Sequence, residues 1–138
     1  MRVSQRLDYA LRALVVLAMQ PPGAYVAAGD LANRLNLPRR FVEQQVTELA
    51  RAGVVECRRG SSGGCTLARA PEDISVADIA IALQGEVLDV PQLTGSAAAL
   101  VWQEAADRLT DQLAGIDLGS VAARQRALDS AAAPMYYI

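Results

Sequence analysis

The chain has 138 residues, of which 52% are hydrophobic, and a formal net charge of −2. This length and apolar content predict one domain, or a small domain with an appendage, that folds without stabilising disulfides or metals. The longest apolar run, residues 13–19, is too short to span a bilayer, and no secretory leader pattern is recognisable. We therefore expect a cytoplasmic protein without a membrane partner.

Charge is divided unevenly along the chain. Residues 1–70 carry ten arginines against five acidic residues, a net charge of +5, whereas residues 71–138 carry three arginines against ten acidic residues, a net charge of −7. A basic N-terminal half is typical of proteins that approach phosphate groups. All 13 cationic residues are arginine, which suits bidentate contacts but is explained more simply by a GC-rich genome.

The first two predicted helices follow hydrophobic spacing. Residues 4–19 place apolar side chains at helical intervals behind Ser4, a candidate N-cap. Two prolines and a glycine at residues 21–23 break this helix, and residues 27–35 have the pattern of a short second one.

A tight joint over residues 36–38 leads into a third predicted helix, with Pro38 in its first turn and Gly53 as its stop. Two short helices joined in this way form a helix-turn-helix. The apolar spacing turns one face of the third helix inward, so its outward residues are Arg40, Glu43, Gln44, Thr47 and Arg51.

Strand-like runs at residues 54–59 and 65–68 flank the tip GSSGG, which predicts a β-hairpin placed as the wing of a winged helix-turn-helix. The glycines permit positive φ. The backbone N–H groups and the hydroxyls of Ser61 and Ser62 can approach phosphates closely.

Three more helices are predicted after the hairpin. Ser75 caps one that ends at Gly85, residues 86–95 form a linker without a clear period, and residues 96–116 form a long amphipathic helix. Asp117 caps a last segment that continues to about residue 128. The long helix either buries its apolar stripe against a second copy of the chain, which we favour, or packs back onto its own domain.

The predicted fold class is therefore mainly α-helical with a small β-hairpin: a winged helix-turn-helix domain plus a long dimerisation helix. The winged domain occupies residues 1–85 and the linker residues 86–95. Residues 96–130 form the dimerisation helix and C-terminal helical segment, and residues 131–138 a tail.

The third helix and the wing are the candidate DNA-binding surface. Arg recognises guanine acceptors, Glu the amino group of cytosine, and Gln the donor and acceptor of adenine. A wing arginine suits an adjacent narrow minor groove, although strand alternation points Arg58 and Arg59 in opposite directions, so only one is expected to reach DNA. The candidate residues are Arg39, Arg40, Glu43, Gln44, Arg58, Arg59, Ser61, Ser62 and Gly63. The alternative is an ordinary solvated surface.

The string FVEQQVTELARAGVVECRRGSSGGCTLARAPEDISVADIAIALQGE, together with SQRLDYALRAL, resembles the Rrf-two family of bacterial winged-helix transcription regulators typified by IscR, NsrR and CymR. The resemblance is close over residues 2–86 and weaker through the long helix. It implies a homodimeric regulator, usually a repressor, that binds near-palindromic promoter sites. By position, Glu43 and Gln44 match the family's recognition-helix pair, and Arg59 matches the wing arginine.

The chain departs from that family's cluster-binding members, which carry three cysteines between the wing domain and the dimerisation helix. Here that segment has no cysteine and the chain has no histidine. Asp8, in the matching first helix, cannot hold an iron–sulfur cluster alone. We therefore expect no cofactor and no metal site. Pro38 also replaces a common Ser or Thr, and Cys65 replaces an aromatic residue.

The two cysteines, Cys57 and Cys65, both lie in the hairpin. Pairing Arg58 with Gly64 sets them directly opposite and allows a disulfide, whereas pairing Arg59 with Cys65 forbids it. The sequence does not choose between these registers. The neighbouring arginines favour a reactive thiol and hence a redox switch, but two inert half-buried cysteines are the simpler interpretation.

The sequence thus favours a homodimeric DNA-binding repressor without a cluster. Without a cluster or thiol sensor, the candidate effectors are a small molecule or a protein at residues 86–95, although no residue there specifies a ligand and constitutive repression is the other option. One alternative is a winged-helix module that binds another protein and not DNA; another is a regulator switched by Cys57 and Cys65. Enzyme activity is not expected, since the chain lacks histidine, a nucleophile beside a base, and metal-ligand spacing.

Overall fold

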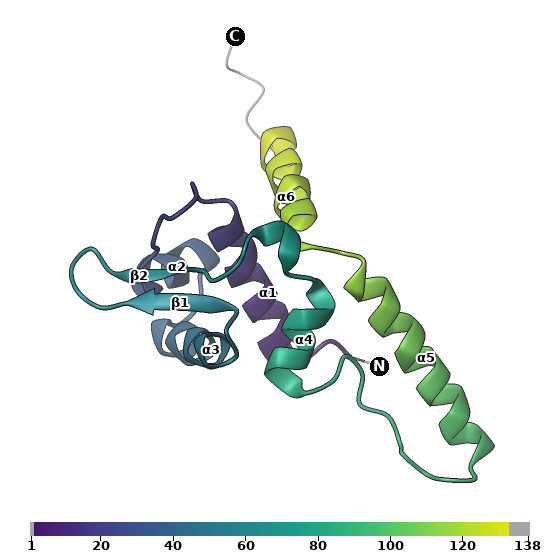
Figure 1. Ribbon diagram of the computed structural model, residues 1–138. Coiled ribbons are helices and arrows are strands. Elements are labelled where there is room, and N and C mark those ends of the chain that lie inside the picture. Colours follow the sequence, from purple (N-terminus) through teal and green to yellow (C-terminus); the bar gives the residue numbers. More distant parts are fainter. Residues whose placement is uncertain (1, 133–138) are drawn as a thin grey trace.

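The computed structural model describes residues 2–132 and confirms a mainly α-helical winged-helix fold (Figure 1). The central helix α1 (Gln5–Ala18) packs against helices on several sides and against the hairpin. The Ser4 hydroxyl accepts a hydrogen bond from the Leu7 N–H at 3.1 Å, which confirms the predicted N-cap. Fully buried Ala10 and Leu14 place α1 at the centre of the core.

The helix-turn-helix consists of α2 (Ala28–Leu35) and α3 (Arg39–Arg51). Asn36 ends α2 in the left-handed conformation with φ of 54°, a conformation that Asn tolerates better than most residues. Pro38 is the extended N-cap of α3 and lies one residue before the helix, not in its first turn as expected. The inward stripe is confirmed, because Val42, Gln45, Val46 and Leu49 are buried.

The wing is an antiparallel pair of strands, β1 (Val55–Arg58) and β2 (Gly64–Leu67). A short segment before α2 extends this pair, because Val26 and Cys65 exchange both backbone hydrogen bonds, at 2.9 and 2.8 Å. The hairpin is therefore fastened to the domain through β2, and its turn projects freely.

The second half begins with the short 3-10 helix η1 (Pro71–Asp73) and α4 (Val76–Gln84). Ser75 and Asp78 form a reciprocal capping box at the start of α4, and Gly85 ends that helix with φ of 80°. Both boundaries were predicted from the sequence. Residues 86–95 contain no helix or strand, which agrees with the expected absence of a regular period there.

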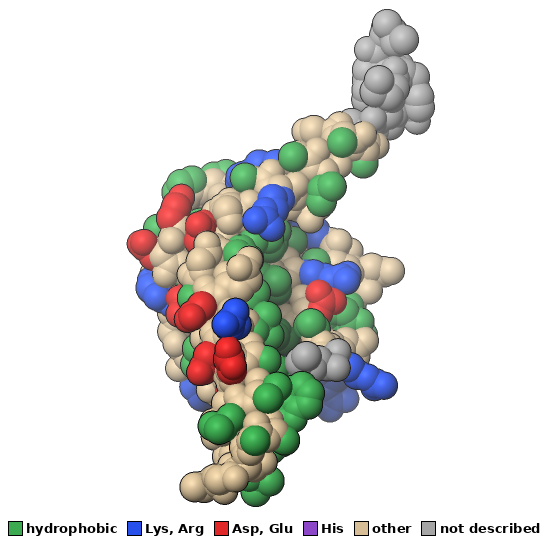
Figure 2. All heavy atoms as spheres, turned by 90° about the vertical axis from the view of Figure 1, so that its right-hand side faces the viewer, with side chains coloured by type: hydrophobic (Ala, Val, Ile, Leu, Met, Phe, Trp, Pro, Cys, Tyr) green, Lys and Arg blue, Asp and Glu red, His purple; other side chains and the backbone are tan. Residues whose placement is uncertain are grey.

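Helix α5 (Ala97–Ala114) runs along the outside of the molecule and touches α4, and Ala99 is its only buried residue. Figure 2 faces this side and shows hydrophobic side chains gathered toward the lower end of the molecule, where α5 begins. Exposed fractions are 63% for Leu100, 58% for Val101 and 47% for Trp102. The helix therefore leaves much of its apolar stripe uncovered by its own chain.

Helix α6 (Leu118–Ala132) returns to the domain and packs on α1 and η1. Leu118 and Ala122 are buried in the common core. The Asp117 carboxylate accepts a hydrogen bond from the Ser120 N–H at 2.9 Å, as expected for a cap. The helix continues past residue 128, so residues 131 and 132 of the expected tail are helical; residues 133–138 lie outside the described range.

None of the helices within residues 2–132 is both long enough and apolar enough to cross a bilayer.

Candidate nucleic-acid interface

The outward face of α3 carries four of the candidate DNA-binding residues. Arg39, Arg40, Glu43 and Gln44 are all exposed. The Arg39 Nε lies 2.8 Å from the Glu43 Oε1, one helical turn away, and the Arg39 guanidinium lies over Gly29 at the start of α2. The Arg39 side chain thus lies beside the Glu43 carboxylate on the exposed face of α3.

The inner face of α3 is fastened to the rest of the domain. The Phe41 ring stacks edge-to-face on Tyr9 of α1, with centroids 5.4 Å apart. The Glu48 carboxylate lies 3.1 Å from the Arg6 guanidinium, which also donates to the Leu83 carbonyl on α4. These contacts tie α3 to α1 and α4, so its outward side chains are presented on a rigid support.

Arg58 and Arg59 lie in different environments on the hairpin. The Arg58 guanidinium stacks over the Tyr25 ring, 4.1 Å from its centroid, and so is directed onto the protein. Arg59 follows the last residue of β1 and is exposed, without an ion pair among residues 2–132. Both arginines are exposed, but Arg58 stacks on a neighbouring ring whereas Arg59 lies beyond the end of β1. Tyr25, which no sequence motif singled out, decides which one remains free.

The hairpin turn is closed by the Gly63 N–H, which donates to the Gly60 carbonyl at 3.0 Å. Ser61 and Ser62 form the exposed tip. A side chain at Gly63 would collide with the Arg58 carbonyl, and one at Gly64, where φ is 139°, would collide with the Val26 backbone. Close packing of the backbone therefore requires glycine at both positions.

The two cysteines are joined by a disulfide between adjacent strands. The register pairs Arg58 with Gly64 and Cys57 with Cys65, with the two cysteine Cα atoms 4.2 Å apart. Cys65 directs its backbone hydrogen bonds to Val26 on its other side, so the cysteines form a non-hydrogen-bonded pair, in which opposite side chains approach closely. Cys65 is 5% exposed, whereas Cys57 lies on the surface.

The fold brings α3 and the wing to one side of the molecule. The segment after α3 turns directly into β1, these two elements pack together, and Figure 1 shows the hairpin extending beside α3. A polar helix face beside a projecting hairpin with an exposed arginine matches the geometry by which winged helices contact a major groove and the backbone next to it. These features define a winged-helix DNA-binding protein of the transcription-regulator class.

The family model described as "Rrf2: Iron-dependent Transcriptional regulator" matches residues 3–124. The chain belongs to the Rrf2 family, which is the Rrf-two resemblance noted in the sequence. It is 36% identical over 99 residues to an Rrf2-like HTH-type transcriptional regulator of Rhodobacter capsulatus, covering 69% of this chain and 65% of that protein. It is 27% identical over 138 residues to IscR of Escherichia coli, covering 94% and 85%. These relatives are regulators, not enzymes.

Solved structures give the same fold. CymR, the global cysteine regulator of B. subtilis, superposes with a TM-score of 0.80 at 27% identity, covering 90% of this chain and 98% of that one. IscR of T. potens superposes with a TM-score of 0.79 at 30% identity, covering 99% and 95%. The chain therefore has the architecture of Rrf2-type regulators almost throughout.

The donor set of this chain does not fit the iron chemistry in the family description. Residues 86–96 contain no cysteine, and both cysteines of the chain are in the wing, bonded to each other. Among residues 2–132, no three His, Cys, Asp or Glu side chains are grouped closely enough to hold a metal ion. An iron–sulfur cluster needs several soft ligands, and this arrangement does not supply them.

Proposed function

We propose that the protein binds double-stranded DNA as a homodimer at near-palindromic promoter sites and represses transcription without an iron–sulfur cluster. One observation carries the proposal: the exposed polar face of α3 lies beside a hairpin in which Arg59, directly before the turn, is exposed and makes no ion pair among residues 2–132. In this assignment Arg40, Glu43 and Gln44 meet base edges in the major groove, and Arg59 enters the adjacent minor groove.

Backbone contacts supply affinity in the same assignment. Ser61, Ser62 and the backbone N–H of the tip meet phosphates, and Arg39 orients Glu43. The uncovered apolar residues of α5 support the dimer, because a second copy would remove them from water. Two copies related by a two-fold axis would read two half-sites, which explains the expected near-palindrome.

The first test is fluorescence anisotropy of the protein with labelled DNA from the region upstream of its own gene, titrated across salt. We expect sequence-dependent binding whose logarithmic affinity falls linearly with the logarithm of salt, because arginines displace counterions from phosphates. In vitro transcription from the same promoter should decrease as the protein is added. Negligible DNA affinity at low salt would instead favour the protein-interaction alternative.

A second candidate function, a redox switch, is favoured by the disulfide within the wing. Oxidation removes two electrons and two protons from the cysteine thiols, and a peroxide that accepts them is reduced to two waters. The bond would restrict the wing and so fix where Arg59 meets DNA. The test is to measure the DNA dissociation constant of the reduced and the oxidised protein. The control is Cys57→Ser, which cannot form the disulfide. Equal constants in the two states would exclude the switch.

A further inference from the structure

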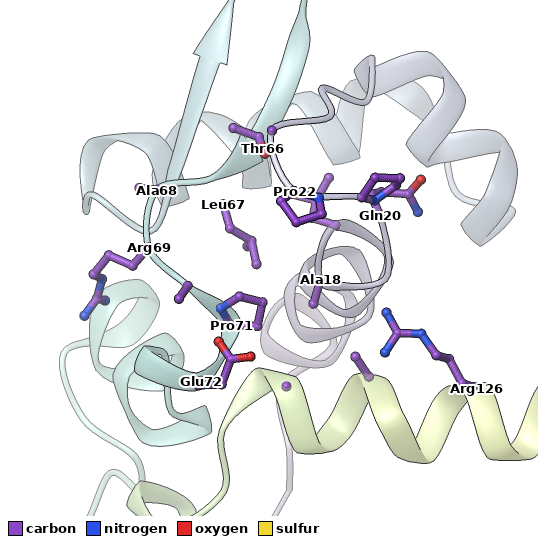
Figure 3. A pocket seen from close by; sticks show the side chains of 16 residues that line it. Ala18, Gln20, Pro22, Thr66, Leu67, Ala68, Arg69, Pro71, Glu72 and Arg126 are labelled. Carbon is purple, nitrogen blue, oxygen red and sulfur yellow. The ribbon is translucent and has the colours of Figure 1, made fainter.

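A cavity of about 630 Å³ lies between the end of α1, the base of the hairpin, η1 and α6 (Figure 3). Its volume is within the range of small-molecule sites. None of the residues assigned above to DNA contacts lines it. The cavity is therefore separate from the candidate nucleic-acid interface and also from the linker at residues 86–95.

Four apolar side chains from four separate segments form part of the cavity wall. Ala18 belongs to α1, Pro22 to the loop after it, Leu67 to the end of β2, and Pro71 to η1. Figure 3 shows these side chains around the same space. Such walls suit a small aliphatic or aromatic group, which would leave water on binding.

The floor is one face of α6. Gly119, Ala122 and Arg126 stand at helical positions i, i+3 and i+7 and so share that face. A Cβ at Gly119 would lie 3.5 Å from the Cγ of Glu72 and 2.9 Å from the Asp117 carboxylate. The absence of a side chain at Gly119 thus leaves room for Glu72 at one end of the cavity. The small side chain of Ala122 leaves the middle of the cavity open.

Opposite charges occupy the two ends of this floor. Glu72 lies against Gly119, and Arg126 is seven residues further on, roughly 10 Å along the axis at about 1.5 Å per residue. Both side chains are exposed at the rim. Within residues 2–132, neither side chain makes an ion pair or a hydrogen bond.

Two further polar side chains at the cavity, those of Arg69 and Gln20, donate hydrogen bonds within the chain. Arg69 donates to the Asp73 carbonyl at 3.3 Å, and Figure 3 shows its guanidinium pointing away from the space. The Gln20 amide donates to the Val16 carbonyl at 2.9 Å. Glu72 and Arg126 are therefore the charged groups left for a ligand.

We propose that this cavity binds a small zwitterion of the α-amino acid class with an apolar side chain. The ammonium group would meet Glu72, the carboxylate would meet Arg126, and the side chain would pack on Ala18, Pro22 and Leu67. Arginine suits the carboxylate because its planar fork donates to both oxygens.

Isothermal titration calorimetry of the full chain without DNA tests the site. The probes are L-valine, L-leucine, L-methionine and L-phenylalanine, compared with 4-methylpentanoate and isoamylamine, which resemble leucine without its ammonium or its carboxylate. We expect at least one amino acid to bind with a dissociation constant below about 1 mM, and each single-charge analogue of leucine to bind about tenfold more weakly than leucine.

Variants locate the binding. Glu72→Gln and Arg126→Gln should each weaken it about tenfold. Asp73→Asn and Arg124→Gln are matched controls that remove the same charges from neighbouring residues outside the cavity lining, and they should bind as the wild type does. Circular dichroism melting checks that every variant is folded. The proposal is overturned if none of the four amino acids binds the folded protein, if 4-methylpentanoate binds as tightly as leucine, or if the charge variants retain full affinity.

The site also has a regulatory consequence, which rests on the proposed DNA-binding function. Thr66 and Leu67 of β2 and the loop leading to Val26 border the cavity, and Val26 is bonded to Cys65 of β2. A ligand there contacts both segments that fasten the wing, so a saturating amino acid should change the DNA dissociation constant about fivefold or more. An unchanged constant would overturn this regulation. Calorimetric binding without DNA affinity would overturn only the proposed function.

Discussion

Two adjacent arginines, Arg58 and Arg59, show how one residue's environment decides its role. Both side chains are exposed, but Arg58 stacks on Tyr25, whereas Arg59 lies beyond the end of β1. The cation–π contact holds the Arg58 side chain against the domain. We therefore expect Arg59, and not Arg58, to reach a minor groove.

Arg59→Ala should weaken DNA binding and relax the preference for A·T pairs next to each half-site, since it removes the side chain assigned to the minor groove. The salt slope of binding should become shallower by about one unit for each phosphate that the variant no longer neutralises. Anisotropy titrations across salt measure both effects. Arg108→Ala on α5 is the control for removal of a positive charge, and an equal effect of the two substitutions would contradict the assignment.

Glu43→Ala should change which base pair is accepted at one position of each half-site more than it changes overall affinity. A good base contact discriminates by about 1–3 kcal/mol, and the substitution also releases Arg39 from its 2.8 Å ion pair. Binding to a set of operators with single base-pair changes measures the preference. Glu104→Ala breaks a similar pair with Arg108 on α5 and should leave it unaltered. If Glu43→Ala and Glu104→Ala accept the same base pairs at every position, Glu43 does not contact a base.

Among the secondary-structure elements, the hairpin is the one whose pairing the sequence left open. Its register follows from contacts outside the hairpin. Cys65 directs both backbone hydrogen bonds to Val26, and Gly64 allows the Val26 backbone to pass where a side chain would collide. The segment before α2 thus helps to select the register that aligns Cys57 with Cys65.

Reduction of the wing disulfide should lower the free energy of unfolding by about 2 kcal/mol. The bonded cysteines are eight residues apart, and closing a loop of that length removes a corresponding amount of entropy from the unfolded chain. Urea unfolding with and without reductant measures the difference. The Cys57→Ser variant should have the same urea midpoint with and without reductant. If the urea midpoint of the wild type is also unchanged by reductant, the disulfide does not form in solution.

At the scale of the whole molecule, α5 is the helix with the most large apolar side chains left exposed. Leu100, Val101 and Trp102 remain largely exposed, although the helix touches α4. A single chain can cover only one side of a helix that projects in this way. The proposed second copy would cover the rest.

The double variant Val101→Glu and Leu109→Glu should convert a dimer to a monomer, because each carboxylate would have to be buried unpaired in the interface. Binding to a two-half-site operator should then weaken about a hundredfold because avidity disappears. Sedimentation velocity measures the mass and anisotropy the affinity. Asp107→Lys, which also changes charge on the exposed surface of α5, should stay dimeric. A monomeric wild type would contradict the proposed dimer.

The six α-helices, several of their caps and the winged-helix class could be predicted from the amino-acid sequence, whereas Pro38 proved to be the N-cap of α3 and not part of its first turn. These are local or periodic properties: Ser4, Ser75 and Asp117 cap the helices that follow them, and the burial of α3 follows its apolar spacing. The resemblance in the recognition helix and wing also identified the family.

The hairpin register, the stacking of Arg58 on Tyr25 and the cavity between Glu72 and Arg126 emerge only from the packing of the folded chain. Each joins residues from segments with no local pattern in common. Glu72 and Arg126 are more than 50 positions apart and face one cavity because α6 returns to pack on α1 and η1. Periodicity reports which side of an element is apolar, but the packing of distant elements decides which side chains meet.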